Sequence, residues 1–216
     1  MDLKGKWLQR SRWWLIFTVS ALPVSLLVYS AVNQQLGADP AKEIVLELGT
    51  WAINFLWITL AITPVRKMFG WNWLAKYRRM MGLYSFVYAA LHLLAFATFM
   101  VGWNWKILII EITERPYAIV GFIALLLLLP LAVTSTKAMQ RRLKKRWSTL
   151  HKLVYPIALL SLLHIIWQIR SDFSEALTYG LLLCFLLGYR FYQSRLKSAS
   201  SVKRSAGGIK LKTQTN

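Results

Sequence analysis

Three histidines are the residues of this chain whose type and position suggest chemistry. His92 and His164 each lie inside a long uncharged stretch, where an ionisable side chain is rare and commonly functional. His92 follows Arg79 by 13 residues, and His164 follows Lys152 by 12. If both stretches are helical, a rise of about 1.5 Å per residue places the two imidazoles roughly 18–20 Å along their helices. They would therefore lie at nearly the same depth.

This pair of histidines predicts a haem site. Two imidazoles at one depth on neighbouring helices can ligate a haem iron from both faces, as in b-type cytochromes. We therefore expect His92 and His164 to be the axial ligands of haem b. Tyr84, Tyr88 and Phe96 recur at four-residue intervals with His92 and would share its helical face. The alternative is that the histidines only hydrogen-bond between helices.

His151 lies 13 residues before His164, near the basic end of the same stretch. An ideal helix turns about 100° per residue, so the two side chains would point about 140° apart. Pro156 lies between them, and a kink there could align their faces. His151 could then ligate a second haem, although the matching positions on the other helix hold Arg78 and Arg79. The alternative is a histidine at the membrane interface.

The elements that carry the histidines are expected to be transmembrane helices. Hydrophobic residues make up 56% of the 216 residues, charged residues only 16%, and the mean hydropathy is +0.44. The apolar residues form blocks close to the roughly 20 residues that cross a bilayer as a helix. We expect an all-α membrane protein, a bundle of six transmembrane helices at residues 13–32, 48–64, 80–101, 117–134, 151–169 and 174–192. The last is the weakest, because Arg190 lies inside it and would have to reach the headgroups.

The charges alternate between the two sides of this bundle. Of the 27 Lys and Arg residues, 23 lie in residues 1–12, 65–79, 135–152 and 190–216. Lys and Arg collect on the cytoplasmic side of membrane proteins, so both termini should be cytoplasmic. The same placement explains the net charge of +19 without a nucleic-acid partner. Seven of the eight acids fall in the opposite, periplasmic connections: Asp39, Glu43, Glu47, Glu111, Glu114, Asp172 and Glu175.

The chain divides into three parts. Residues 1–12 form a basic cytoplasmic N-terminus, residues 13–192 the six-helix haem-binding domain, and residues 193–216 a basic tail expected to be disordered. Cys184 is the only cysteine, which excludes an intrachain disulfide. The sequence contains no nucleotide-binding or hydrolase motif. Any chemistry must take place inside the bundle or on a partner.

Four strings carry a resemblance to a known family: LGADPAKE, RRMMGLYSFVYAALHLL, ITERPY and TSTKAMQRRLKKRWSTLHKLVY. In their order and spacing they resemble the MsrQ family of haem-binding membrane subunits, within the ferric-reductase-like transmembrane superfamily. The resemblance covers about residues 35–170.

The resemblance implies a b-type cytochrome of the bacterial inner membrane, surrounded by lipid, that carries one haem b or two and uses FMN. It implies that His92, His151 and His164 are haem-linked. It also implies electron transfer from quinol to a periplasmic molybdopterin enzyme that reduces methionine sulfoxide in oxidised proteins. The chain would then be an electron-transfer subunit and not the catalytic one.

Four arginines are candidates to bind the charged groups of these cofactors. Haem propionates and a flavin phosphate need cationic partners at the membrane edge. Arg78, Arg79 and Arg142 would lie at the cytoplasmic edge, and Arg115 at the periplasmic edge. The alternative is that these arginines only set the topology.

Two other classes of function remain open. The chain lacks the second histidine on its third span that two bis-histidine sites would need, and it has no NAD- or FAD-binding extension. One alternative is a self-sufficient ferric reductase of the same superfamily. The other is a cofactor-free transporter or assembly factor, which would more often show glycine-broken spans and an internal repeat. We recognise neither feature in the sequence.

Overall fold

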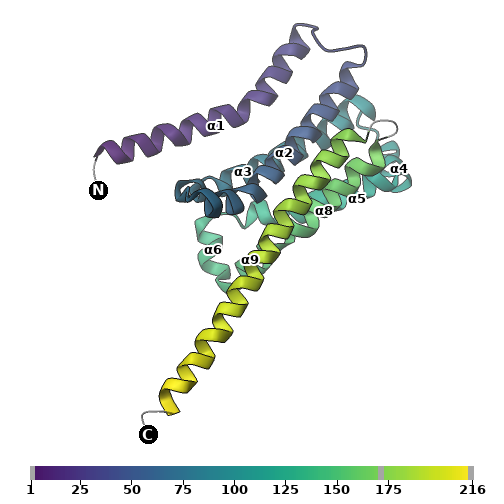
Figure 1. The fold of residues 1–216 in the computed structure, drawn as a ribbon. Helices are drawn as coiled ribbons and strands as arrows, with labels where there is room; N and C mark the ends of the chain where they lie inside the picture. Colours follow the sequence, from purple (N-terminus) through teal and green to yellow (C-terminus); the bar gives the residue numbers. More distant parts are fainter. Residues whose placement is uncertain (1–2, 170–172, 214–216) are drawn as a thin grey trace.

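The structure is a computed structural model that describes residues 3–169 and 173–213, and these residues form helices and no strand. Figure 1 shows the arrangement. The α-helices are α1 (Leu3–Val32), α2 (Pro40–Phe69), α3 (Arg78–Ala95), α4 (Trp105–Glu114), α5 (Pro116–Val133), α6 (Lys137–Leu143), α7 (Lys145–Leu150), α8 (Val154–Gln168) and α9 (Ser174–Thr213). Two short 3₁₀ segments, η1 (Asn72–Lys76) and η3 (His151–Leu153), and a π-helical segment, η2 (Phe96–Met100), complete the described fold.

Five segments of the described chain are long and apolar enough to cross a membrane. They are Gly5–Val32, Pro40–Phe69, Arg78–Met100, Pro116–Val133 and Lys145–Gln168. These segments contain the first five predicted spans, except that the last residue of the third, fourth and fifth spans lies just outside. The sixth predicted span, residues 174–192, forms the first half of α9, which is not one of these five segments. A sixth crossing therefore stays a prediction.

The helix α2 lies at the centre of the bundle and contributes to both large core clusters. Its Leu60 and Trp57 are almost fully buried against α5, α8 and α9, while Phe55 packs among residues of α3. The indole Nε1 of Trp57 donates to the Tyr179 carbonyl of α9 (3.1 Å), and the Tyr179 hydroxyl donates to Asn54 Oδ1 of α2 (2.8 Å). These polar links join the first half of α9 to the central helix.

The two ends of the bundle differ in charge. The α1–α2 connection, α4 and the first turn of α9 lie at one end, called here the acidic end because it holds six of the described carboxylates: Asp39, Glu43, Glu47, Glu111, Glu114 and Glu175. The segments η1, α6 and α7 lie at the other end, called here the basic end (Figure 1). The chain termini also lie away from the acidic end. Arg170 and Asp172, which belong to a predicted periplasmic connection, lie outside the described residues.

Tyr84 and Tyr88, which the sequence places on the helical face of His92, attach α1 to α3 through their hydroxyl groups. The Tyr88 hydroxyl donates to the Ser20 carbonyl (3.0 Å) and accepts from the Val24 amide (3.1 Å). The hydroxyl thus lies between a carbonyl and an amide of α1 that would pair directly in a regular helix. Both groups are close to Pro23, and proline disturbs the backbone hydrogen bonds of a helix. The Tyr84 hydroxyl donates to the Phe17 carbonyl (2.8 Å). Both tyrosines are therefore hydrogen-bonded to the backbone of α1 through their hydroxyl groups.

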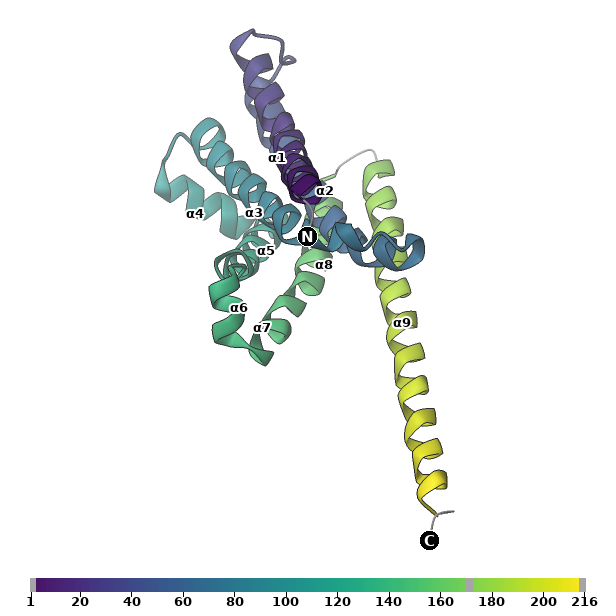
Figure 2. The ribbon, with the colours of Figure 1, turned by 90° about the vertical axis from the view of Figure 1, so that its left-hand side faces the viewer.

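The C-terminal part of α9 extends beyond the other helices (Figure 2). The sequence predicts disorder for residues 193–216, whereas α9 continues as a helix to Thr213. Residues 193–213 contain no proline, and Lys, Arg, Gln and Ala have good helix propensity. Residues 214–216 lie outside the described residues.

Candidate haem site

His92 of α3 and His164 of α8 meet inside the bundle. Their ring centroids lie 6.3 Å apart and the ring planes are nearly perpendicular, at 88°. Both residues are largely enclosed by the helices around them. The structure therefore brings together the two histidines that the sequence places at one depth.

Each of these imidazoles is oriented by a backbone carbonyl. His92 Nδ1 lies 2.8 Å from the Val45 carbonyl oxygen of α2, and His164 Nδ1 lies 2.7 Å from the Tyr117 carbonyl oxygen of α5. A carbonyl oxygen only accepts hydrogen bonds, so Nδ1 must carry the proton in both rings. Nε2 of each neutral imidazole is then left with its lone pair. Histidines that ligate metals in proteins are commonly held in this way.

The separation of the rings suits two ligands on one metal ion. A metal–imidazole bond is about 2.0–2.1 Å long for zinc, and the ligating nitrogen lies about 1 Å from the ring centroid. Two imidazoles on opposite sides of one metal ion therefore place their ring centroids about 6 Å apart. No group of three or more His, Cys, Asp or Glu side chains that could hold a metal ion occurs among the described residues. The pair thus fits an iron whose other ligands come from a macrocycle, as in haem.

Two glycines make room for the histidine rings. A Cβ on Gly121 would lie 2.6 Å from His164 Nδ1, and one on Gly49 would lie 3.0 Å from His92 Nδ1. Real Cβ atoms essentially never approach a neighbour within 3.0 Å, and an imidazole held by a carbonyl has little freedom to retreat. At position 121 only glycine leaves the His164 ring in place, and a side chain at position 49 would push the His92 ring by a few tenths of an ångström. The sequence reasoning missed both glycines.

The two halves of the site share one spacing. Each histidine bonds the carbonyl of the residue 47 positions before it, and in both halves a glycine follows that carbonyl residue by four positions. The α2–α3 pair and the α5–α8 pair therefore hold their histidines in the same manner. This repeat of contacts corrects the statement that the chain shows no internal repeat. Aligning the chain with itself from the two histidines would have detected it.

His151 is not brought to the histidine pair. Its ring stacks on Trp147 at 4.1 Å, and its Nε2 lies 3.3 Å from the Thr134 hydroxyl. The expected kink at Pro156 does not align it with His164, because Pro156 lies in the first turn of α8 and His151 precedes that helix in η3. The missing amide of proline costs nothing in a first turn, where amides have no helical acceptor.

The three arginines that the sequence predicts at the cytoplasmic edge lie on two helices. Arg78 and Arg79 begin α3, and Arg142 lies in α6, with all three side chains exposed. Arg78 lies within electrostatic range of His151, and also of Arg66, Arg190 and Tyr155. Arg78 thus lies near His151, which is also a candidate cofactor residue.

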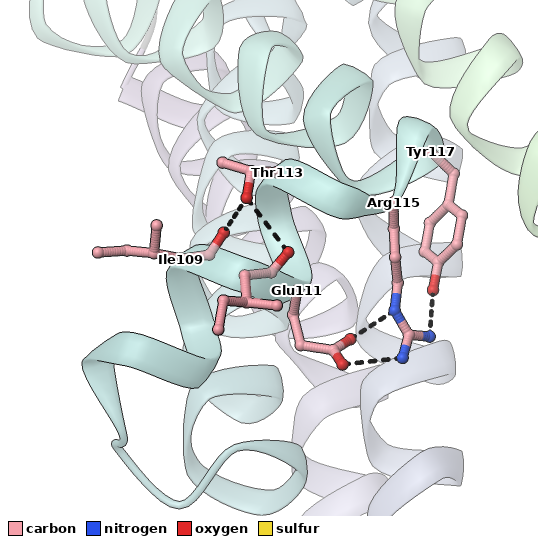
Figure 3. Close-up of polar contacts among 6 residues, drawn as sticks. Ile109, Glu111, Thr113, Arg115 and Tyr117 are labelled. Carbon is pink, nitrogen blue, oxygen red and sulfur yellow. Dashed lines mark hydrogen bonds and ion pairs between the residues drawn. The ribbon is translucent and has the colours of Figure 1, made fainter.

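Arg115 is held by its own neighbours at the acidic end (Figure 3). Its Nε lies 2.6 Å from Glu111 Oε2, its Nη2 donates to Glu111 Oε1 (2.8 Å), and its Nη1 donates to the Tyr117 hydroxyl (2.9 Å). The hydrogen bond to Tyr117, reinforced by Glu111, raises the pKa of Arg115 above its ordinary value. The Tyr117 carbonyl accepts a hydrogen bond from His164, so Tyr117 links Arg115 to the histidine pair.

Comparison with known proteins agrees with this geometry. A family model described as "Ferric reductase like transmembrane component" matches residues 48–162. Curated relatives named "Protein-methionine-sulfoxide reductase heme-binding subunit MsrQ" include one from Xanthomonas oryzae pv. oryzae (strain MAFF 311018), 43% identical over 198 residues, which cover 89% of this chain and 91% of the relative. Another, from Polaromonas naphthalenivorans (strain CJ2), is 41% identical over 195 residues and 89% of each chain. No solved structure gives a significant match.

The chain belongs to the MsrQ family. It is a multi-pass membrane protein of the ferric-reductase-like transmembrane group. The matched residues 48–162 include Gly49, His92, Gly121 and His151, and they end two residues before His164.

Proposed function

We propose that this chain is the electron-transfer subunit of a methionine sulfoxide reductase system. In this proposal it is a b-type cytochrome of the bacterial inner membrane that takes electrons from quinol and delivers them to a periplasmic molybdopterin reductase, which repairs oxidised proteins. The observation that carries the proposal is the perpendicular pair of His92 and His164, each held at Nδ1 by a carbonyl. The names of the relatives support both the haem and the reductase.

In the proposed site, Nε2 of His92 and Nε2 of His164 would hold the haem iron. Bound between them, haem b supplies a one-electron redox centre. Because the two imidazoles leave no open position, the site would exchange electrons without binding oxygen or substrate. The carbonyls of Val45 and Tyr117 hold the rings in one tautomer, and Gly49 and Gly121 let them approach.

We also propose that the acidic end faces the periplasm and receives the reductase. Tyr117, whose carbonyl holds His164, is the second residue of α5 and lies at this end. The histidine pair would thus be close to the surface where a partner docks. Transient redox partners commonly use small, electrostatically steered contacts, and the carboxylates of the acidic end would attract a basic patch.

Electron entry would take place from the membrane or from the basic end. We extend the proposal to FMN, since Arg78, Arg79 and Arg142 at the basic end offer the cations that a flavin phosphate needs. His151 is the proposed ligand of a second haem, if one is bound there, and the haem content per chain decides between one haem and two.

Reconstitution tests the proposed function. The purified cytochrome is reduced, and the oxidised reductase and a protein that contains methionine sulfoxide are added while the haem absorbance is followed. We expect rapid haem reoxidation that needs both additions. Reoxidation by ferric chelates at equal speed, with none by the reductase, would instead support a self-sufficient ferric reductase. A purified protein without a Soret band would support the cofactor-free transporter or assembly factor.

A further inference from the structure

A pocket at the basic end lies between the beginning of α1 and the connection that precedes α3. Its volume is about 480 Å³, within the range of about 300–1,000 Å³ that small-molecule sites commonly have. One wall comes from residues 6–14 of α1, and the other is formed by Lys76 of η1 and Tyr77. It is called here the α1–η1 pocket. Neither a histidine nor any of the four candidate arginines lines it, so it is distinct from the candidate haem site.

Two side-chain contacts join the walls of the α1–η1 pocket. Lys76 Nζ donates to Gln9 Oε1 (3.1 Å), and an ammonium group has three donors, so Lys76 keeps donors for a ligand. The guanidinium of Arg12 lies over the Trp73 ring, 5.8 Å from its centroid. Trp73 in turn packs edge to face against Tyr77, with ring centroids 5.8 Å apart. The fold thus brings α1 and η1 together around a shared opening.

The polar part of the pocket is positively charged. Lys6, Arg10 and Lys76 line it with exposed side chains, and no acidic residue is among the lining residues. The described carboxylates all lie at the acidic end of the bundle, and Asp2 lies outside the described residues. Three cations around one opening repel one another, and an anion that enters between them is attracted by all three. The pocket therefore favours an anionic ligand.

The remaining part of the pocket is aromatic. Trp13 and Trp14 line it at the point where α1 changes from charged to apolar residues, and their rings meet edge to face at 4.9 Å. Both indoles are exposed, and indole rings prefer the level of the lipid headgroups. Trp13 also stacks on Phe17, one turn further into the apolar part of α1 (5.3 Å). The aromatic wall thus continues from the pocket in the direction that an acyl chain would follow.

An anionic phospholipid matches both parts of the pocket better than a soluble anion. Its phosphate would accept charge-assisted hydrogen bonds from the cations, while its glycerol and upper acyl carbons would lie on the indoles. A soluble phosphate would fill only the polar part and leave the aromatic wall in water. Basic clusters beside a membrane span commonly bind anionic lipids.

We propose that the α1–η1 pocket binds the headgroup of one anionic phospholipid. Lys6, Arg10 and Lys76 hold the phosphate, and Trp13 and Trp14 cover the glycerol and the first carbons of the acyl chains. The bound lipid fixes the beginning of α1 beside η1. Neither the haem nor the reductase is needed for this binding.

Titration of the full chain with three probes tests the pocket. The protein is stripped of lipid in a non-ionic detergent and titrated in mixed micelles with phosphatidylglycerol or with phosphatidylcholine of the same acyl chains, and separately with inorganic phosphate. Calorimetry gives the affinities, and native mass spectrometry counts the lipids bound per chain. Arg10→Gln and Lys76→Gln, single and combined, are compared with Arg141→Gln, which removes one charge from an exposed position of α6 at the same end. Circular dichroism shows whether each variant is folded.

We expect one phosphatidylglycerol to bind per chain, at least about tenfold more tightly than phosphatidylcholine. Each single Gln variant should weaken this binding about fivefold, the usual effect of one cation beside an anionic membrane surface, and the combined variant more than about tenfold. Arg141→Gln should leave the binding unchanged. Arg10→Lys should retain most of it, because the phosphate still meets a cation there.

If one of the Gln variants does not fold, Lys6→Gln replaces it, since Lys6 also lines the pocket. Four results would each overturn the proposal: no saturable binding of phosphatidylglycerol, equal binding of both phospholipids, equal weakening by Arg141→Gln, or binding of inorganic phosphate as tight as that of phosphatidylglycerol. The last result would identify a site for a soluble anion.

Discussion

At the scale of residues, the candidate site depends on what lies behind each imidazole. The carbonyls of Val45 and Tyr117 select the tautomer, and the absent side chains of Gly49 and Gly121 make those bonds sterically possible. Outer-shell groups of this kind commonly contribute 10–100-fold to metal affinity. The glycines should therefore matter to haem binding without touching the haem.

Gly121→Ala tests this role of the glycines. The new Cβ would lie 2.6 Å from His164 Nδ1, so the ring must move and lose its bond to Tyr117. We expect haem content per chain to fall about tenfold or more, with the remainder high-spin. Gly49→Ala should have a smaller effect, because its Cβ would lie 3.0 Å away.

Gly82→Ala is the matched control on α3, because its Cβ would meet Thr59 at an ordinary 3.7 Å. Haem content is measured by the pyridine haemochrome method in each purified variant. Full haem content in Gly121→Ala would show that the His164 ring has room that the geometry denies it.

The histidine pair could be predicted from the sequence, but its supports could not. Depth along a helix follows from residue count, so His92 and His164 could be matched without a structure. Whether a helical glycine faces a neighbour depends on the rotation and packing of the helices, which residue count does not supply. For the same reason the hydrogen bond from Arg190 of α9 to the Leu60 carbonyl of α2 could not be foreseen. That carbonyl is free because Pro64, four residues on, has no amide hydrogen.

At the scale of elements, long apolar helices were predictable and short ones were not. The long apolar stretches of the sequence correctly predicted α1, α2, α3, α5 and α8. The helices α4, α6 and α7 were missed because each has only 6–10 residues and lies in a connection. Their formation depends on capping and on packing against the bundle more than on propensity. The Asn104 side chain, for example, caps α4 by accepting from the Lys106 and Ile107 amides.

The attachment of α1 rests on the Tyr88 hydroxyl, which can be removed alone. Tyr88→Phe deletes the bridge between the Ser20 carbonyl and the Val24 amide while keeping the buried ring. We expect the free energy of unfolding to fall by about 0.5–1.5 kcal/mol, the usual net value of such a hydrogen bond. Denaturant unfolding in detergent, followed by tryptophan fluorescence, measures the change.

Tyr29→Phe provides the comparison, because Tyr29 is an exposed tyrosine of the same region, on α1. If both variants unfold with the wild-type midpoint, the Tyr88 bridge contributes nothing and α1 is held by apolar packing alone.

At the scale of the whole molecule, the two ends of the bundle differ in charge, and α9 is attached to the central helix. The acidic and basic ends differ as the alternating connections predict, and α9 is tied to the central helix through Trp57, Asn54 and Tyr179. A helix that is bonded along α2 in this way is placed to cross the membrane beside it. Six crossings, with both termini in the cytoplasm, stay our prediction.

Reporter fusions test the number of crossings. A reporter inserted in the α1–α2 connection near Asp39 should be active only in the periplasm, and one fused after Asn216 only in the cytoplasm. Periplasmic activity of the C-terminal fusion would mean that α9 does not cross and that the bundle has five spans.

The central claim is that His92 and His164 together ligate one haem b. The most direct measurement is the low-temperature electron paramagnetic resonance and absorbance spectrum of the oxidised protein, wild type against His92→Ala, His164→Ala and the control His151→Ala. We predict a low-spin signal that either of the first two changes abolishes or converts to high-spin, and that His151→Ala leaves in place. A wild-type low-spin spectrum in both His92→Ala and His164→Ala would contradict the account.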